Sequence, residues 1–352
     1  MAVLTSVLIG CGAIAREHLA AIKDLNDARV TAVCDLSAAR AEATAERFGI
    51  ERWYTDYEKL LADCRPSVVH ITTPPSAHAA IAKTCLAAGL NVFCEKPITI
   101  DYSDFAALKQ LATDNRCMLM ENQNLRFHSS ILRIQNLLTS GMMGDLLDVQ
   151  ICIALNLYET GSPYVDPNMP HFGLGLRGGV IGDFLPHIAY LALMFTGTVI
   201  DLRTTWAKRR AGSPMAADEF RGLVRGQHAP AYVSFSGNSQ INGYWVRVSG
   251  TKMYAEANLL EPPRLILRRY RAGEPALMSV LGGIAESGAV LRGTLAGFFR
   301  KLGGTSSYDG LPELIKRTYK TIERGQEQPV PLQEIDDVAK LVHRFTTAEL
   351  QL

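Results

Sequence analysis

The chain has 352 residues, of which 47% are apolar and 20% charged, a globular balance that excludes a mainly disordered protein. Lys and Arg total 36 and Asp and Glu total 35, so we expect no nucleic-acid partner, because such proteins usually carry a basic excess. The length exceeds that of one ordinary α/β core and predicts two domains.

The seven cysteines are widely spaced and include no Cys-x-x-Cys pair. This pattern predicts neither a zinc ribbon nor a disulfide framework, and it favours a reducing, cytoplasmic location. The apolar run Val3–Ile9 is short and lacks the basic lead-in of a signal peptide. No uncharged apolar run approaches the length of a membrane span, so we expect no membrane partner.

Short apolar stretches alternate with helical patterns through residues 1–123. The expected strands are Val3–Ile9, Val30–Cys34, Trp53–Tyr54, Ser67–Ile71, Asn91–Cys94 and Met118–Glu121. The expected helices are Ala15–Leu25, Ser37–Phe48, Asp56–Ala62, His78–Ala88 and Tyr102–Asn115. Continuously apolar strands with helices between them predict a doubly wound parallel sheet, covered on both faces, of the Rossmann type.

The pattern changes over residues 124–352, which we expect to form a second α/β domain. The expected strands there are Leu147–Leu155, Ile200–Lys208, Ala231–Ser236, Tyr244–Ser249, Lys252–Ala257 and Arg264–Arg269. The expected helices are Ser129–Ser140, Asp183–Phe195, Leu311–Gly325 and Leu332–Leu350. Long strands separated by turn residues predict a large open sheet, mostly antiparallel, with one face covered.

An apolar stripe at helical spacing runs through residues 276–304, with basic residues beside it. Ile284, Leu291 and Leu295 belong to this stripe. Three interpretations remain open: a packed or subunit-interface helix, a mobile flap near a substrate, and a helix lying on a membrane surface.

A glycine turn follows the first strand, where residues 10–15 read Gly-Cys-Gly-Ala-Ile-Ala. In such a turn the first glycine permits the sharp bend and the second lets the backbone approach a pyrophosphate, while the final alanine keeps the helix close to the sheet. The free N–H groups of the helix N-terminus then face the phosphates. The residues expected to bind the cofactor here are Gly10, Gly12, Ala13, Ile14 and Ala15.

Asp35 ends the second strand about 20 residues beyond this turn, where a ribose-binding acid is expected. A carboxylate accepts hydrogen bonds from the two adenosine ribose hydroxyls and repels a 2′-phosphate, so NAD is favoured over NADP. Arg40 lies close enough in sequence to reach a 2′-phosphate, which keeps NADP open.

Two loops follow the fourth and fifth strands, at the edge where ligands bind in doubly wound sheets. Lys96 follows the fifth strand. Desolvation there would lower the pKa of its ammonium group enough for acid–base catalysis. The alternative is a lysine on the surface without a catalytic role. Pro97 restricts Lys96 to an extended conformation. After the fourth strand, the residues expected near the cofactor are Thr72, Thr73, Pro74 and His78, with a purely structural role open for His78.

Asp183 and His187 are four residues apart in the long helix of the second domain and therefore share one face. Pro186 is expected within the first turn of that helix. No third ligand accompanies the pair, so we expect an acid–base pair and no metal site. The alternative, which stays open, is that Asp183 caps the helix and His187 packs in the core, so that both have structural roles.

Together these residues resemble the Gfo/Idh/MocA family, named for glucose–fructose oxidoreductase, inositol dehydrogenase and a rhizopine-catabolism protein. The resemblance spans essentially the whole chain. The motifs that carry it are Gly10–Ala15 with Asp35, Thr73-Pro74-Pro75 with His78, Glu95-Lys96-Pro97, Asn124-Leu125-Arg126-Phe127, Gly144, Gly179 with Asp183 and His187, and Gly250-Thr251-Lys252.

The resemblance implies a Rossmann domain followed by an α/β domain whose open sheet forms a homodimer or homotetramer interface. It implies Lys96, Asp183 and His187 as catalytic residues that also bind substrate, with Arg126 facing the substrate. Glu95 and Asn124 are further cofactor contacts that the matching motifs imply.

The segment Asn156–Arg177 matches no known specificity. It is rich in proline, glycine and aromatic residues, and we expect it to cover the substrate, with Tyr164 in contact. The expected activity is NAD(P)-dependent hydride transfer to or from a secondary alcohol or ketone of a sugar, polyol or sugar nucleotide. The resemblance leaves two alternatives, a non-catalytic NAD-responsive regulator and an NAD-dependent glycosidase.

Overall fold

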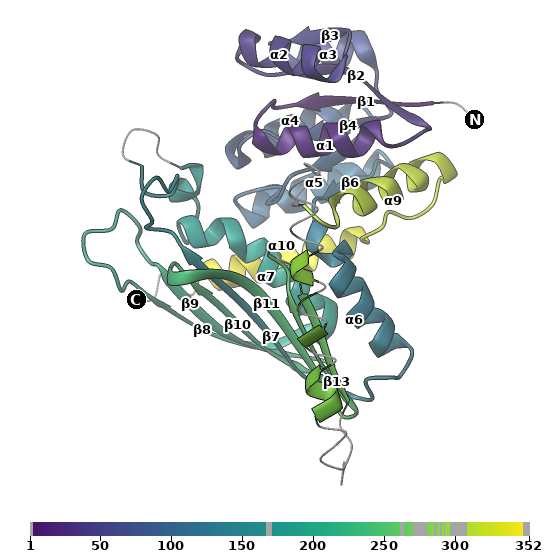
Figure 1. Ribbon diagram of the computed structural model, residues 1–352. Coiled ribbons are helices and arrows are strands. Elements are labelled where there is room, and N and C mark those ends of the chain that lie inside the picture. The colour runs from purple at the N-terminus through teal and green to yellow at the C-terminus, as the bar shows by residue number, and fades with distance from the viewer. Residues whose placement is uncertain are drawn as a thin grey trace. The chain divides into compact units, whose positions relative to one another are not determined.

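The computed structural model describes residues 3–166, 171–260, 264–269, 280–284, 287–288, 291, 293–295 and 308–347. Its contacts divide the chain into two compact units, coloured along the chain in Figure 1. The first comprises Met1–Asn124 and Gly310–His343, and the second comprises Leu125–Asp309 and Arg344–Leu352. The expected boundary at 123/124 separates only the N-terminal part of the first unit, because the chain returns to that unit near its end.

The sheet of the first unit has six parallel strands in the order β3-β2-β1-β4-β5-β6. The strands are β1 (Leu4–Ile9), β2 (Ala28–Cys34), β3 (Arg52–Tyr54), β4 (Val68–Ile71), β5 (Asn91–Cys94) and β6 (Leu119–Glu121). The strand order reverses between β1 and β4, so the loops after these strands meet at the switch point where such sheets bind ligands. This confirms the predicted Rossmann sheet.

Seven helices of the described residues belong wholly or mainly to this unit. They are α1 (Ala13–Lys23), α2 (Ala38–Phe48), α3 (Tyr57–Cys64), α4 (Pro75–Ala87), α5 (Tyr102–Asp114), α9 (Leu311–Arg324) and α10 (Leu332–Thr347). Helix α9 packs along α1 (Figure 1). Asp336 of α10 accepts hydrogen bonds from Tyr102 and Lys109 of α5, which fixes the returning segment on the Rossmann unit.

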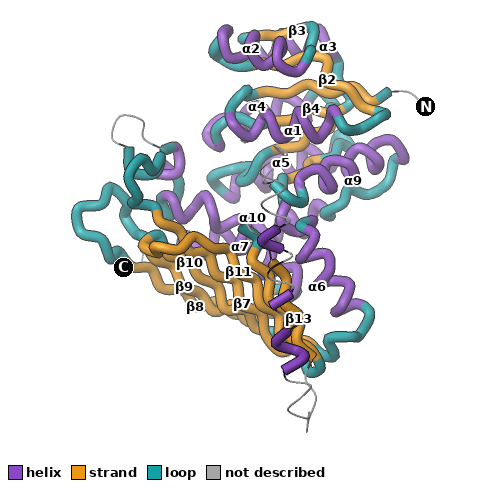
Figure 2. Tube along the Cα trace, viewed as in Figure 1, coloured by secondary structure: helices purple, strands orange, loops and turns teal. Residues whose placement is uncertain are grey.

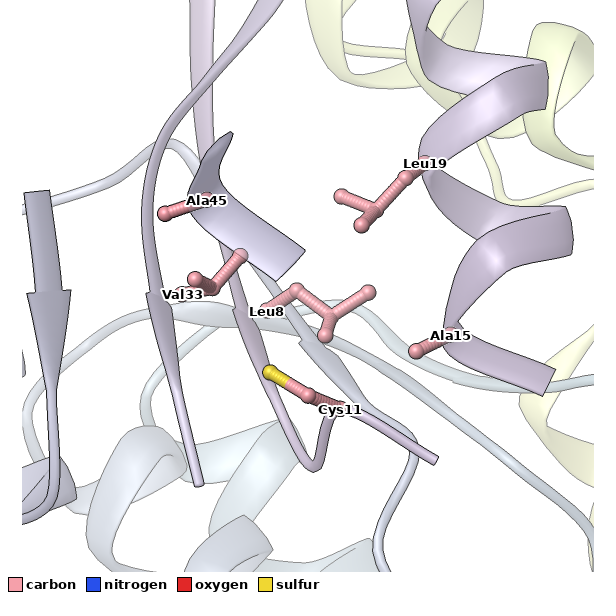
Figure 3. Packing of buried hydrophobic residues seen from close by; sticks show 6 residues of the cluster. All are labelled: Leu8, Cys11, Ala15, Leu19, Val33 and Ala45. Atoms are coloured by element: carbon pink, nitrogen blue, oxygen red, sulfur yellow. The ribbon is translucent and has the colours of Figure 1, made fainter. Parts of the chain in front are cut away.

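A tight apolar cluster lies beneath the glycine turn (Figure 3). Ala15 and Leu19 lie on one face of α1, and they pack toward β1 and β2 because residues four apart share a helix face. Ala15 is fully buried and small, which lets the start of α1 approach the sheet closely. The remaining members of the cluster are Leu8, Cys11, Val33 and Ala45.

The second unit contains a seven-stranded sheet in the order β13-β12-β11-β7-β10-β9-β8, drawn in orange in Figure 2. Its strands are β7 (Leu146–Asn156), β8 (Val199–Ala207), β9 (Glu219–Gly226), β10 (Pro230–Ser236), β11 (Asn238–Gly250), β12 (Met253–Asn258) and β13 (Arg264–Arg269). Only the pair β7–β10 is parallel, and the other neighbours are antiparallel. This confirms the predicted mostly antiparallel sheet and adds β9, which the sequence pattern did not indicate.

Helix α7 (Val180–Thr196) packs against β7, β9 and β10. The unit also contains α6 (Ser129–Thr139) and the short helices η1 (Asn124–Phe127) and η2 (Phe172–Gly175). The expectation that Pro186 lies in the first turn of α7 was wrong. Gly178 and Gly179 have positive φ angles and start the helix earlier, so Pro186 falls in the second turn, where its missing N–H removes one helical hydrogen bond.

The apolar stripe expected over residues 276–304 lies largely outside the described residues. Those described there are helical, and Ile284, Leu291 and Leu295 are exposed, which leaves its three interpretations open. Among the residues that the structure describes, no helix combines the length and apolarity that crossing a membrane requires.

Candidate functional site

The glycine turn after β1 lies against the end of β4. Gly10 has a φ of +100°, and a Cβ at this position would lie 2.6 Å from backbone atoms of Thr72 and Thr73. The Thr72 hydroxyl donates to the carbonyl of Gly10 at 2.6 Å. Only glycine fits here, because both the backbone angle and the space exclude a side chain.

Gly12 shows the opposite situation. A Cβ placed there would meet nothing within 4 Å, and no side chain caps the N-terminus of α1 that Gly12 begins. No described side chain therefore fills the space beside Gly12 or caps this helix, and the N–H groups at a helix N-terminus are suitable donors for an anion such as a pyrophosphate. The residues present fit a dinucleotide at this turn.

Asp35 is nine-tenths buried beside the turn, and two backbone N–H groups fix its carboxylate. Cys11 N–H donates to Oδ2 and Ser37 N–H donates to Oδ1, both at 2.9 Å. Each oxygen keeps a further lone pair for a ribose hydroxyl. Arg40, the residue that could reach a 2′-phosphate, is well exposed, and its Nη1 lies 3.5 Å from Asp35 Oδ2. The arginine and the carboxylate expected to bind the ribose therefore lie side by side.

The loop after β4 carries an unsatisfied polar atom. The hydroxyl of Thr73 is buried without a hydrogen-bond partner, which costs free energy unless a ligand supplies one. His78 on α4 links this loop to the next, because Nε2 lies 2.7 Å from the Thr73 carbonyl and Nδ1 lies 2.8 Å from the Pro97 carbonyl. Burial lowers the pKa of His78, although both carbonyls oppose this. The described contacts of His78 are thus structural.

Lys96 is half-buried directly after β5, and its peptide bond to Pro97 is cis. Two buried carboxylates, Glu95 and Glu121, interact electrostatically with it. Burial raises the pKa of Glu121, although hydrogen bonds from Gln123 and the Ile98 N–H oppose this. Lys96 therefore lies near two buried acidic side chains.

Behind Glu95 lies a buried set of hydrogen bonds that the sequence analysis missed, which we name the histidine network. His18 Nε2 lies 2.8 Å from Glu95 Oε1, and His18 Nδ1 lies 2.9 Å from His70 Nδ1. His70 Nε2 in turn lies 3.0 Å from the hydroxyl of Tyr319 on α9. Asn122 Nδ2 donates to Glu95 Oε1 at 2.6 Å. One available signal was His18 itself, a polar residue on the apolar face of α1.

In the second unit, Asp183 lies in the first turn of α7 and is buried. His187 follows one turn later, is half-buried, and places Nδ1 2.6 Å from the Tyr190 hydroxyl. That contact holds the imidazole ring in one orientation.

Tyr164 packs against two other aromatic rings and interacts electrostatically with Asp183. The ring of Tyr164 lies 4.7 Å from that of His171 and 6.3 Å from that of Phe184. Burial raises the pKa of Tyr164 to about 12, with a further contribution from the charge of Asp183. Tyr164 thus keeps its hydroxyl proton near neutral pH, and its expected substrate role stays a prediction. Arg126 lies in η1 and is half-buried.

The candidate residues fall into two sets, each described within its own unit. The first unit holds the glycine turn, Asp35, Arg40, the loop of Thr72–His78, Glu95, Lys96 and Asn124, and the second holds Arg126, Tyr164, Asp183 and His187. Within the described part of the chain, no group of three or more His, Cys, Asp or Glu side chains could hold a metal ion.

Residues 4–123 match the family model described as an oxidoreductase family with an NAD-binding Rossmann fold. The Rossmann domain of this chain belongs to the Gfo/Idh/MocA oxidoreductase family. The match covers the glycine turn, Asp35 and Lys96 together, so the sequence resemblance is confirmed for this domain.

Two curated relatives of this family are dehydrogenases. The chain is 28% identical over 219 residues to D-apiose dehydrogenase of Paraburkholderia graminis, covering 62% of this chain and 56% of that protein. It is 33% identical over 191 residues to inositol 2-dehydrogenase of Rhizobium meliloti, covering 54% of each. The matches thus span about half the length of these relatives.

Solved structures resemble the whole fold. An oxidoreductase from Agrobacterium radiobacter, in complex with NAD⁺, L-tartaric acid and magnesium, has a TM-score of 0.77 at 21% identity, covering 97% of this chain and 94% of that one. Levoglucosan dehydrogenase in complex with NADH has a TM-score of 0.78 at 19% identity, covering 98% and 97%. At this identity the likeness shows the fold alone.

Proposed function

We propose that the protein is an NAD-dependent oxidoreductase that transfers a hydride between the nicotinamide and a secondary alcohol or ketone of a sugar, polyol or sugar nucleotide. The observation that carries this proposal is the glycine turn, open at Gly12 and flanked by an Asp35 carboxylate that two backbone N–H groups fix. The sugar and polyol dehydrogenases among its relatives support the substrate class.

The bound nicotinamide supplies the hydride acceptor or donor. In the proposed mechanism, the N-terminus of α1 binds the pyrophosphate and Asp35 binds the adenosine ribose. Lys96 or His187 takes the hydroxyl proton during oxidation, and the other group stabilises the developing negative charge on the substrate oxygen. Asp183 and Tyr164 orient the substrate, and Arg126 contacts it.

Cofactor preference is tested by fluorescence titration of the protein with NADH and, separately, NADPH. We expect tighter binding of NADH, because the buried carboxylate of Asp35 repels a 2′-phosphate. The variant Arg40→Ala should leave NADH binding unchanged. Tighter NADPH binding that Arg40→Ala abolishes would instead assign Arg40 to a 2′-phosphate, and the absence of binding of either nucleotide would overturn the proposal.

Catalysis is tested with Lys96→Ala in a screen of NAD⁺ reduction against sugars, polyols and sugar nucleotides. We expect the variant to lose about 10²- to 10⁴-fold in kcat, the usual contribution of one acid–base group, with NADH affinity nearly unchanged. Lys83→Ala, which removes an exposed lysine of α4, serves as the matched control. Turnover of Lys96→Ala equal to that of the control would reject the assignment of Lys96.

We further propose that the protein is a homodimer or homotetramer associated through the outer face of its seven-stranded sheet. The strand registers align Arg203, Leu223, Tyr232, Gln150 and Arg247 in a cross-strand row. Leu223 and Tyr232 are large apolar side chains exposed on that row, beside a hollow of about 510 Å³. Exposed apolar surface rimmed by polar residues is typical of protein interfaces.

A further inference from the structure

The histidine network occupies the apolar interior of the Rossmann unit. His18 and His70 are completely buried, and both rings pack against Phe93 of β5. Buried polar groups are costly unless every donor and acceptor finds a partner. Each ring nitrogen of both histidines has a partner in the network, so the chain of hydrogen bonds runs without a break from Glu95 to Tyr319, whereas Asn122 Oδ1 is buried without a partner.

The direction of the hydrogen bonds along the network is linked to the state of Glu95. One proton lies between His18 Nδ1 and His70 Nδ1, and it belongs either to His70, with Tyr319 then donating to His70 Nε2, or to His18, with His70 then donating to Tyr319. When the proton belongs to His70, a neutral His18 carries its hydrogen on Nε2 and donates it to an ionised Glu95. When it belongs to His18, Nε2 carries a hydrogen only in the imidazolium form, and a neutral His18 would instead accept a hydrogen from a protonated Glu95. Asn122 donates a further N–H to Glu95 Oε1, and two donated hydrogen bonds at that oxygen favour the ionised form.

We infer that the histidine network is a positioning device for the proposed reaction: His18, His70 and Tyr319 hold the Glu95 carboxylate ionised beside Lys96 and thereby set the pH at which Lys96 loses its proton. This inference rests on the proposed function of Lys96. It assigns a role to Tyr319, a residue of the returning helix α9 that is far from Lys96 in the sequence.

Electrostatic effects agree with this geometry. Burial alone would raise the pKa of Glu95, but the hydrogen bond and charge of His18, the hydrogen bond from Asn122 and the charge of Lys96 lower it. Burial and the neighbouring His18 both lower the pKa of His70, so His70 stays neutral. A negative charge at Glu95 favours the ammonium form of Lys96.

Within the Rossmann unit, several other titratable groups act on this pair. His78 of α4 interacts with both Glu95 and Lys96, Glu121 of β6 interacts with both, and Cys94 interacts with the two carboxylates. None of these groups is bonded to His18 or His70 in the contacts that define the network. Changes in the network therefore reach Lys96 through Glu95.

The inference predicts shifts in the titration of Lys96, measured on the full-length protein by acetylation with acetic anhydride at a series of pH values. Peptide mass spectrometry reads the labelling of Lys96, with the exposed Lys83 as internal reference. We expect Glu95→Gln and His18→Leu to move the midpoint for Lys96 about one pH unit lower, because each removes or neutralises the adjacent charge. Tyr319→Phe should give roughly a third of that shift, since it weakens the network at its far end.

Phe105→Leu is the matched control, because it disturbs a fully buried side chain of the same unit outside the network and should leave the midpoint unchanged. An unshifted midpoint in His18→Leu and Tyr319→Phe would overturn the inference, and if His18→Leu does not fold, Tyr319→Phe decides alone. The labelling needs neither substrate nor cofactor. Loss of turnover in Lys96→Ala tests the proposed function separately, so the two can fail independently.

Discussion

Two glycines of one turn, Gly10 and Gly12, are constrained in opposite ways. A side chain at Gly10 would collide with backbone atoms of Thr72 and Thr73, whereas a side chain at Gly12 would meet no protein atom. The first glycine is therefore required by the fold. The fold does not require the second glycine, which is needed only if a ligand approaches the N-terminus of α1.

This difference predicts opposite outcomes for two matched substitutions. Gly10→Ala should destabilise the Rossmann unit by about 1–3 kcal/mol, the usual cost of a strained backbone position, and thermal unfolding measures it. Gly12→Ala should unfold like the wild type but bind NADH at least about tenfold more weakly, because its methyl group occupies the approach of the pyrophosphate. Wild-type NADH affinity in Gly12→Ala would contradict a pyrophosphate at this turn.

The sequence predicted the residues whose roles follow from local order, such as the glycine turn and Asp35. It did not predict the histidine network, because His70 lies within an apolar strand and its partner Tyr319 lies 249 residues further along the chain. A contact of that kind depends on which helix covers α1, and no local pattern encodes it. The roles of Lys96, Asp183 and His187 stay predictions.

At the scale of elements, most expected strands and helices form close to their predicted bounds. Strand β9 was missed because Gly222 and the arginines beside it read as a loop. Gly222 is nevertheless a packing requirement, since a Cβ there would lie 2.8 Å from Cγ2 of Val233 on the paired strand β10.

The contact between Gly222 and Val233 predicts a measurable coupling. Gly222→Ala should destabilise the second unit by about 1–3 kcal/mol through overpacking. Adding Val233→Ala should remove much of that strain, so the double variant should be more stable than the two single effects predict by addition. A double-mutant cycle from urea unfolding measures this, and strictly additive effects would show that the two side chains do not collide.

At the scale of the whole molecule, the sequence predicted two domains but not the return of the chain to the first. Helix α9 packs along α1, and Asp336 of α10 bonds to α5, so the Rossmann unit is completed by a segment nearly 200 residues beyond its last strand. The sequence pattern of an amphipathic helix shows that one face of the helix must be buried. Its sequence does not show which surface will cover it, because that depends on what the other elements leave exposed.

On the outer face of the seven-stranded sheet, Leu223 and Tyr232 lie as cross-strand neighbours. If two copies associate through this face with twofold symmetry, each substitution occurs twice in the interface. Leu223→Asp or Tyr232→Asp should then weaken association by at least about 100-fold, at roughly a factor of ten per copy. Sedimentation equilibrium would report the change as a shift from oligomer to monomer.

Met142→Asp is the matched control, because it places a charge at an exposed apolar residue in the turn after α6, outside the row on the sheet. It should leave the mass in solution unchanged. A wild-type protein that remains monomeric at every concentration would reject the interface. So would an oligomer that both sheet variants leave intact.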